Sequence, residues 1–134
     1  MEINSRSLVR TDLHLLASTD EGFKFHDRLP NVSIETTVNL GAAESKKLIK
    51  LISLLTAVEP AEQMRCHEPR YAAECHYENG ASVRISFCFK CKNLIVSSTE
   101  LRGIIGFNPT NPPGRNLMAF LNATSGIVLD TKST

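Results

Sequence analysis

The chain has 134 residues, of which 42% are hydrophobic and 22% charged, and its formal net charge is +1. This length and balance predict a single domain over residues 1–134 with its own core, and they exclude the strongly basic character typical of nucleic-acid-binding proteins. No run approaches the roughly 18 apolar residues of a membrane span, and the first residues lack the apolar stretch of a signal peptide. We therefore expect neither nucleic-acid nor membrane binding.

Residues 1–29 form the least regular part of the chain, where scattered leucines fit either a short strand or an amphipathic turn. A strand is predicted after Pro30, because apolar or β-branched residues alternate with polar ones there. A helix is predicted over 42–58 and ends before Pro60. The residues that carry these two patterns are Val32, Ile34, Thr36 and Val38 for the strand, and Leu48, Leu51, Ile52, Leu55 and Val58 for the helix.

The stretch from 65 to 96 organises the rest of the chain. Asn79-Gly80 is preferred in a type I′ turn, because both central residues of that turn need positive φ. The dipeptide lies between residues 71–77 and a segment in which apolar residues alternate with polar ones, namely Val83, Ile85, Phe87 and Phe89. We therefore predict a β-hairpin with a two-residue loop.

This loop fixes where the four cysteines lie. With two loop residues, Cys75 faces Arg84, and Cys66, Cys88 and Cys91 gather at the open end of the hairpin. Cys75 lies nearer the turn, about 13 Å from that cluster at the usual strand rise. A three-cysteine cluster is therefore expected, and a four-cysteine site is not.

The same register places three residues of the first strand, Ala72, Glu74 and His76, on the apolar face of the second. Two explanations remain open. Either the first strand is an edge with its polar residues near the rim, or a bulge shifts the register by one residue.

After the hairpin, residues 93–98 predict a third strand, and 101–107 a short strand or return hairpin. A second helix begins with Asn111 as N-cap and Pro112 at its first position. Its buried stripe is Leu117, Phe120 and Leu121, and a last edge strand is expected near 126–129. The predicted fold is α+β, with an antiparallel sheet of four to five strands and one or two helices packed on one face.

Cys88-x-x-Cys91 is the one pair of cysteines whose spacing indicates a chemical role, because two thiols at this separation bind zinc or close a redox disulfide. The predicted metal ligands are Cys66, Cys88 and Cys91. Free packed thiols and a disulfide are the alternatives. Four cysteines without an export signal indicate a reducing compartment, so we expect a cytoplasmic protein.

The sequence contains no nucleophile elbow, no HExxH helix and no phosphate-binding glycine loop. The Cys-His dipeptides at 66–67 and 75–76 each place one side chain on either face of a strand, because neighbouring strand residues point in opposite directions. We therefore expect a non-catalytic protein without a required cofactor, with zinc as the alternative.

Three segments, CHEPRYA at 66–72, CFKC at 88–91 and FNPTNPPGRNL at 107–117, together resemble a group of small, mostly uncharacterised bacterial proteins. The resemblance covers roughly residues 64–123. Proteins of this size and layout often serve as immunity partners that bind and silence a toxin, and the resemblance implies such a role by analogy in size and fold. The near-neutral charge does not favour a nuclease toxin, because many nuclease inhibitors are strongly acidic.

The leading hypothesis is therefore a non-catalytic protein-binding domain, an immunity protein that neutralises a bacterial toxin by occlusion. Its partner would be another protein, a cognate toxin domain, and no oligomeric state is indicated. The alternative is a small zinc-stabilised or thiol redox-sensing module built on Cys66, Cys88 and Cys91.

Overall fold

The computed structural model describes residues 7–23, 31–57, 68–98 and 102–126. Within these ranges the elements follow one another as β1 (Leu8–Phe23), β2 (Val32–Leu40), α1 (Ala42–Ala57), β3 (Tyr71–Tyr77), β4 (Ser82–Cys88), β5 (Asn93–Ser97), β6 (Arg102–Gly106) and α2 (Pro112–Ser125).

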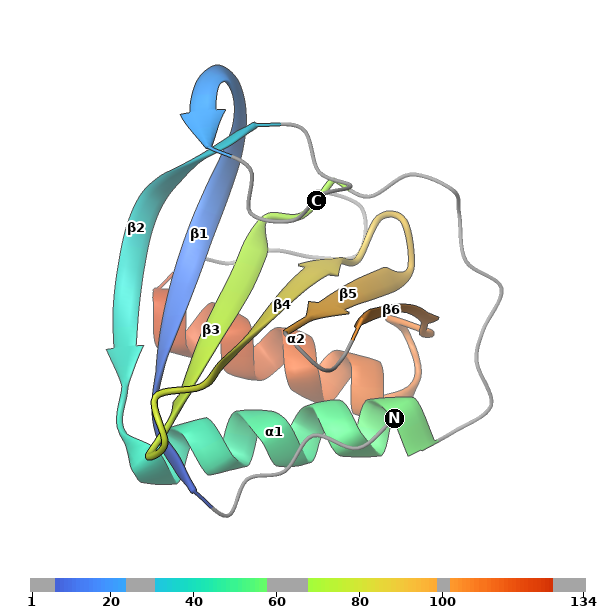
Figure 1. Ribbon diagram of the computed structural model, residues 1–134. Helices are drawn as coiled ribbons and strands as arrows, with labels where there is room; N and C mark the ends of the chain where they lie inside the picture. The colour runs from blue at the N-terminus through green and yellow to red at the C-terminus, as the bar shows by residue number, and fades with distance from the viewer. Residues whose placement is uncertain (1–6, 24–30, 58–67, 99–101, 127–134) are drawn as a thin grey trace.

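The strands form one antiparallel sheet of six in the order β2-β1-β3-β4-β5-β6. Both helices lie side by side across the same face of this sheet (Figure 1). The α+β class and the one-sided helical layer are confirmed, and the predicted four to five strands become six. None of the described helices has the length and apolarity needed to cross a membrane.

The main core lies between the sheet and the two helices. Alternate residues of the central strands point into it, because successive strand side chains point to opposite faces. Tyr71, Ile85 and Phe87 are fully buried there, and Leu48 and Leu117 meet them from the helices. A second, smaller apolar cluster consists of Leu16, Val32 and Ala72.

Strand β1 is the largest departure from the sequence prediction. Residues expected to be irregular form a 16-residue strand that lies between β2 and β3. Leu13 and Leu15 join the main core, and Leu16 belongs to the smaller cluster. Because apolar residues of β1 are buried on both faces, its sequence lacks the clean alternation of a half-exposed strand.

The hairpin of β3 and β4 is confirmed, but its predicted register is wrong by one residue. The N–H of Tyr77 donates to the carbonyl of Ala81 at 3.0 Å, which leaves residues 78–80 as a three-residue loop. Gly80 has φ 85°, and Asn79 does not adopt positive φ, so the turn is not type I′. This matches the hairpin in which a type I turn is followed by a glycine bulge.

The corrected register resolves the conflict in the sequence pattern. Cys75 faces Val83 instead of Arg84, and Ala73 faces Ile85. The apolar residues of both strands therefore share one face, and Glu74 and His76 lie on the other face. Of the two explanations left open by the sequence, the register shift of one residue is the one observed.

Both helices follow local signals. In α2, the side chain of Asn111 accepts a hydrogen bond from the N–H of Gly114 at 2.9 Å, and Pro112 follows as the first helical residue, as predicted. Gly126 ends this helix with φ 73°, a conformation that glycine adopts easily. Residues 127–129 of the predicted last strand, and residue 58, where the first helix was predicted to end, lie outside the described residues.

Candidate functional site

The predicted cysteine site lies in the turn between β4 and β5. Cys88 and Cys91 are both fully buried there. Cys88 is a free thiol, whereas Cys91 is disulfide-bonded. Cys66 and His67, the other members of the predicted cluster, lie outside the described residues. No group of three His, Cys, Asp or Glu side chains within the described ranges has the arrangement of a metal site.

Backbone amides surround the sulfur of Cys88. The N–H of Cys91 donates to Cys88 Sγ at 3.1 Å, and the backbones of Glu68 and Lys90 also form hydrogen bonds with this sulfur. Burial raises the pKa of the Cys88 thiol, and the three backbone hydrogen bonds partly offset this effect because they favour the thiolate. The turn thus holds one thiol in a cage of amide donors.

The fourth cysteine, Cys75, belongs to the main core. Its side chain points toward the helices, and that of His76 points to the opposite face, as predicted for a Cys-His dipeptide on a strand. Burial raises the pKa of the Cys75 thiol to about 11, and its cross-strand neighbour Thr11 only partly offsets this.

Because the folded pKa of Cys75 is raised, its contribution to stability is complete below pH 9, the ordinary pKa of the thiol, and is lost as the pH rises toward 11. The free energy of unfolding should fall by about 2–3 kcal/mol over this range from Cys75 alone. Urea titrations at a series of pH values measure the slope. Cys75→Ala should reduce the slope and leave the parts due to the other groups whose pKa burial raises, namely Tyr71, Cys88 and Tyr77, the last with a pKa of about 12. An identical slope in the variant would contradict the assignment.

The face of the sheet opposite the helices carries two histidine–carboxylate pairs. In the first, His14 of β1 places Nδ1 2.8 Å from Thr37 Oγ1 of β2 and Nε2 2.9 Å from Glu74 Oε1 of β3. His14 is buried, with 6% of its surface exposed. Since both ring nitrogens are engaged, His14 links the three strands β1, β2 and β3.

In the second pair, His76 Nε2 of β3 lies 2.9 Å from Asp12 Oδ2 of β1. Two arginines flank the carboxylates, with Arg10 Nε 3.7 Å from Asp12 and Arg84 Nε 3.9 Å from Glu74. These contacts join β1, β3 and β4 across the face. The arrangement places each carboxylate beside an arginine and a histidine and links three strands of the sheet.

The described sheet has two edge strands, β2 and β6, and β2 is the longer; it pairs with β1 on one side. Residues in the middle of this nine-residue strand are exposed on the surface. Its composition is rich in β-branched residues, and Glu35 is its one charged residue. Natural sheets usually protect such an edge with several charges, prolines or bulges. Here the ladder between β1 and β2 has two register shifts, one between Leu15 and Leu16 and one between Ser18 and Phe23.

The direction of the β2 backbone groups follows from one hydrogen bond. The N–H of Leu16 donates to the carbonyl of Arg70 at 2.8 Å, on the β3 side of β1. Since backbone groups alternate in direction along a strand, the even-numbered residues from Arg10 to Leu16 bond to β3 and the odd-numbered residues between them bond to β2. Leu13 and Leu15 therefore bond to the residues that face them on β2.

Those facing residues are Val38 and Thr36. Thr37 lies between them and must direct its N–H and C=O away from β1, toward the open side of the edge. The same alternation directs the backbone groups of Asn39 outward. The edge of β2 therefore presents donors and acceptors in the pattern that an added strand would bind.

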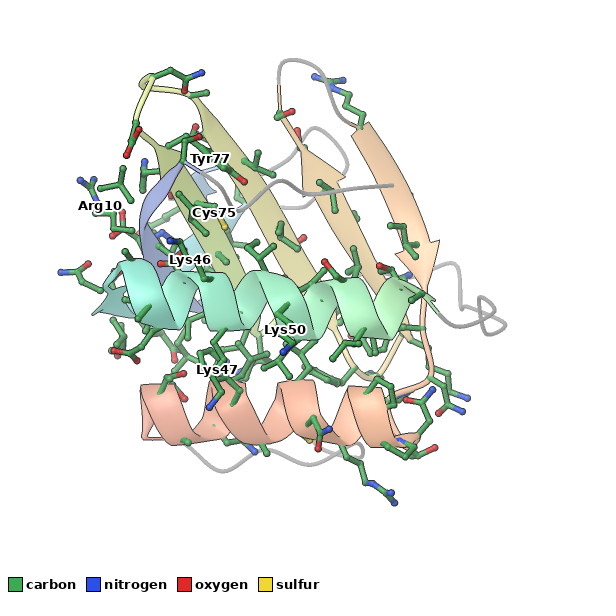
Figure 2. All side chains as sticks on the ribbon, turned by 90° about the horizontal axis from the view of Figure 1, so that it is seen from below. Arg10, Lys46, Lys47, Lys50, Cys75 and Tyr77 are labelled. Carbon is green, nitrogen blue, oxygen red and sulfur yellow. The ribbon has the colours of Figure 1, made fainter. Side chains whose placement is uncertain are left out.

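The helical layer gives the surface beside this edge a basic character. Lys46, Lys47 and Lys50 are exposed on α1, against Glu44 as the one acidic residue of that helix. Figure 2 shows the three lysines along the part of α1 that follows directly from β2. Lys47 Nζ also lies 5.6 Å from the centre of the Phe120 ring. Although the total charge of the chain is near neutral, this surface of α1 is basic.

The sequence predicted the cysteine turn and missed both the polar face and the open edge. His14 and Glu74 are 60 residues apart along the chain, so no local sequence pattern predicts their contact. Asp12 and His14 alternate with Leu13 and Leu15, which is a partial signal for a strand with one polar face, but the alternation ends at Leu16. Comparisons with family models, with curated proteins and with solved structures found no match.

Proposed function

We propose that this protein is a non-catalytic binding domain, and that it engages another protein by adding a strand of that partner to the edge of β2. The observation that carries the proposal is the outward direction of the Thr37 and Asn39 backbone groups on an exposed edge strand. Strand addition uses such groups for affinity, and side-chain contacts on alternate residues provide specificity.

The chemistry of the partner follows from the neighbouring charges. Lys46 and Lys47 lie in the first half of α1, which begins two residues after β2 ends. A strand added to β2 would have this basic face on its helical side. We therefore propose a partner that presents an extended segment with acidic side chains close to it, because charge complementarity directs encounter and orientation.

The immunity-protein hypothesis is a special case of this proposal. The partner would then be a toxin domain, and the added strand would hold the protein over the toxin's active site. Its support is the sequence resemblance and the suitability of an exposed edge for occlusion. A cytoplasmic location remains part of the same hypothesis.

A proline scan of the edge tests the proposal. Thr37→Pro removes an outward N–H and leaves the bonds between β1 and β2, because proline is tolerated on the open side of an edge strand. We expect Thr37→Pro to weaken the partner complex at least tenfold, about 1.4 kcal/mol. Thr37→Val is the matched control, because it also loses the hydroxyl that contacts His14 Nδ1 but retains the N–H.

The measurement is co-expression of the tagged protein with the products of adjacent genes, followed by size-exclusion chromatography and calorimetry of the complex. A one-to-one complex that survives Thr37→Val and is lost with Thr37→Pro supports strand addition. Equal affinity of both variants would exclude the β2 edge as the binding surface. A symmetric dimer of the protein itself, sensitive to Thr37→Pro, would replace the proposed partner with a second copy.

A further inference from the structure

The turn between β4 and β5 has a geometry that the binding proposal does not use. Cys88 Sγ accepts hydrogen bonds from the backbone of Cys91, at 3.1 Å, and from those of Lys90 and Glu68. Lys92, directly after the second cysteine, has φ 57° and is the one described residue other than glycine with positive φ. Positive φ is uncommon for residues other than glycine, so the backbone of Lys92 is strained where the turn closes around the sulfur.

These donors are poorly matched to a neutral thiol. A thiol sulfur is a weak acceptor, whereas a thiolate accepts amide hydrogen bonds strongly. Yet Cys88 is fully buried, and an uncompensated thiolate in a buried position is unfavourable. A cation bound to the sulfur satisfies both requirements, because it neutralises the charge while the amides continue to donate. Hydrogen bonds from the surroundings commonly orient metal ligands in this way.

The spacing supplies a second ligand. Cys91 lies three residues after Cys88, and two thiolates at this separation bind one soft divalent ion. Cys91 is disulfide-bonded in the structure, so its sulfur becomes a ligand only after reduction. We infer that the reduced Cys88–Lys92 turn binds a soft divalent cation of the zinc class through the thiolates of Cys88 and Cys91.

Two chemical steps are required. A thiol reductant first transfers two electrons and two protons to the disulfide of Cys91; that bond breaks and the reductant forms a disulfide of its own. The ion then displaces one proton from each of Cys88 and Cys91, and two metal–sulfur bonds form. These two residues supply two positions of a tetrahedral site. The inference rests on them alone and is independent of the β2 edge.

Cobalt binding to the full-length protein tests the inference, because cobalt gives a thiolate charge-transfer absorption that zinc abolishes when it replaces cobalt. The protein is reduced with a phosphine, freed of metal and titrated with cobalt. We expect one ion per chain with the thiolate absorption. Protein with the disulfide intact should show no such absorption.

One cysteine variant tests a proposed ligand, and a second serves as its control. Cys88→Ser should weaken cobalt and zinc binding at least tenfold. Cys75→Ala is the matched control, since Cys75 is also a buried free cysteine but lies outside the turn, and it should bind the ion as the parent does. Absence of the thiolate absorption in the reduced parent, or its persistence in folded Cys88→Ser, would overturn the inference.

A measurement on the unsubstituted protein covers the case in which Cys88→Ser fails to fold. Reduced protein is treated with an alkylating reagent with and without zinc, and the modified cysteines are mapped by mass spectrometry. Zinc should slow alkylation of both Cys88 and Cys91 at least tenfold and leave Cys75 unaffected. Equal rates with and without zinc would contradict metal binding at this turn.

Discussion

Replacing Gly114 with alanine should destabilise the protein by about 3 kcal/mol, an overpacking effect at the upper end of the usual range. Gly114 is a buried residue in the first turn of α2. A Cβ atom at this position would press against the carbonyl oxygen of Asn108 and lie 2.7 Å from the Cα of Pro109. Both atoms belong to the backbone, so the clash cannot be relieved by rotating a side chain.

The direction of this effect is diagnostic, because glycine-to-alanine changes within helices usually stabilise by about 0.5–1 kcal/mol. Gly41→Ala is the matched control, since no atom lies within 4 Å of a Cβ built there; its effect should stay within about 1 kcal/mol. Thermal unfolding measures both variants. For Gly114→Ala we expect a decrease of roughly 10 °C. A melting temperature equal to that of the parent would contradict the close approach of α2 to residues 108–109.

Truncation of Phe87 should produce an effect at least as large. Phe87 is fully buried on β4 and faces Tyr71 across the hairpin, between the sheet and the helices. Phe87→Ala should lower the free energy of unfolding by about 3–5 kcal/mol, because the lost apolar contacts leave a cavity. Denaturant titration measures the change.

Arg84→Ala provides the comparison within the same strand. The Arg84 side chain lies on the opposite face and is 46% exposed, and its ion pair with Glu74 should contribute less than about 1 kcal/mol. Similar losses for Phe87→Ala and Arg84→Ala would show that the main core does not lie on the side of β4 that the structure assigns.

The two helices could be predicted because their signals are local. Asn111 and Pro112 specify the start of α2, and the apolar residues of α1 recur at helical spacing from Leu48 to Leu55. The burial pattern of α1 nevertheless differs from the predicted stripe in detail, because Ile49 is buried and Leu51 only partly so. A period of 3.6 residues defines the buried face well and its borders less well.

The sheet was harder to predict because its interactions are not local. Asn79-Gly80 is compatible with either a two-residue or a three-residue loop, and only the apolar face of β3 distinguishes them. The outward edge of β2 depends on its pairing with β1, for which the sequence pattern left both a short strand and an amphipathic turn open. The spacing of Cys88 and Cys91 indicated a site, whereas the amide donors around Cys88 depend on the folded turn.

Amide hydrogen–deuterium exchange, resolved by residue in the free and partner-bound protein, tests the central claim most directly. In the free protein, the amides of Thr36 and Val38 should exchange slowly because they bond to β1, and those of Thr37 and Asn39 should exchange fast. Partner binding should slow exchange at Thr37 and Asn39. Unchanged fast exchange at both residues in a saturated complex would show that the partner binds elsewhere.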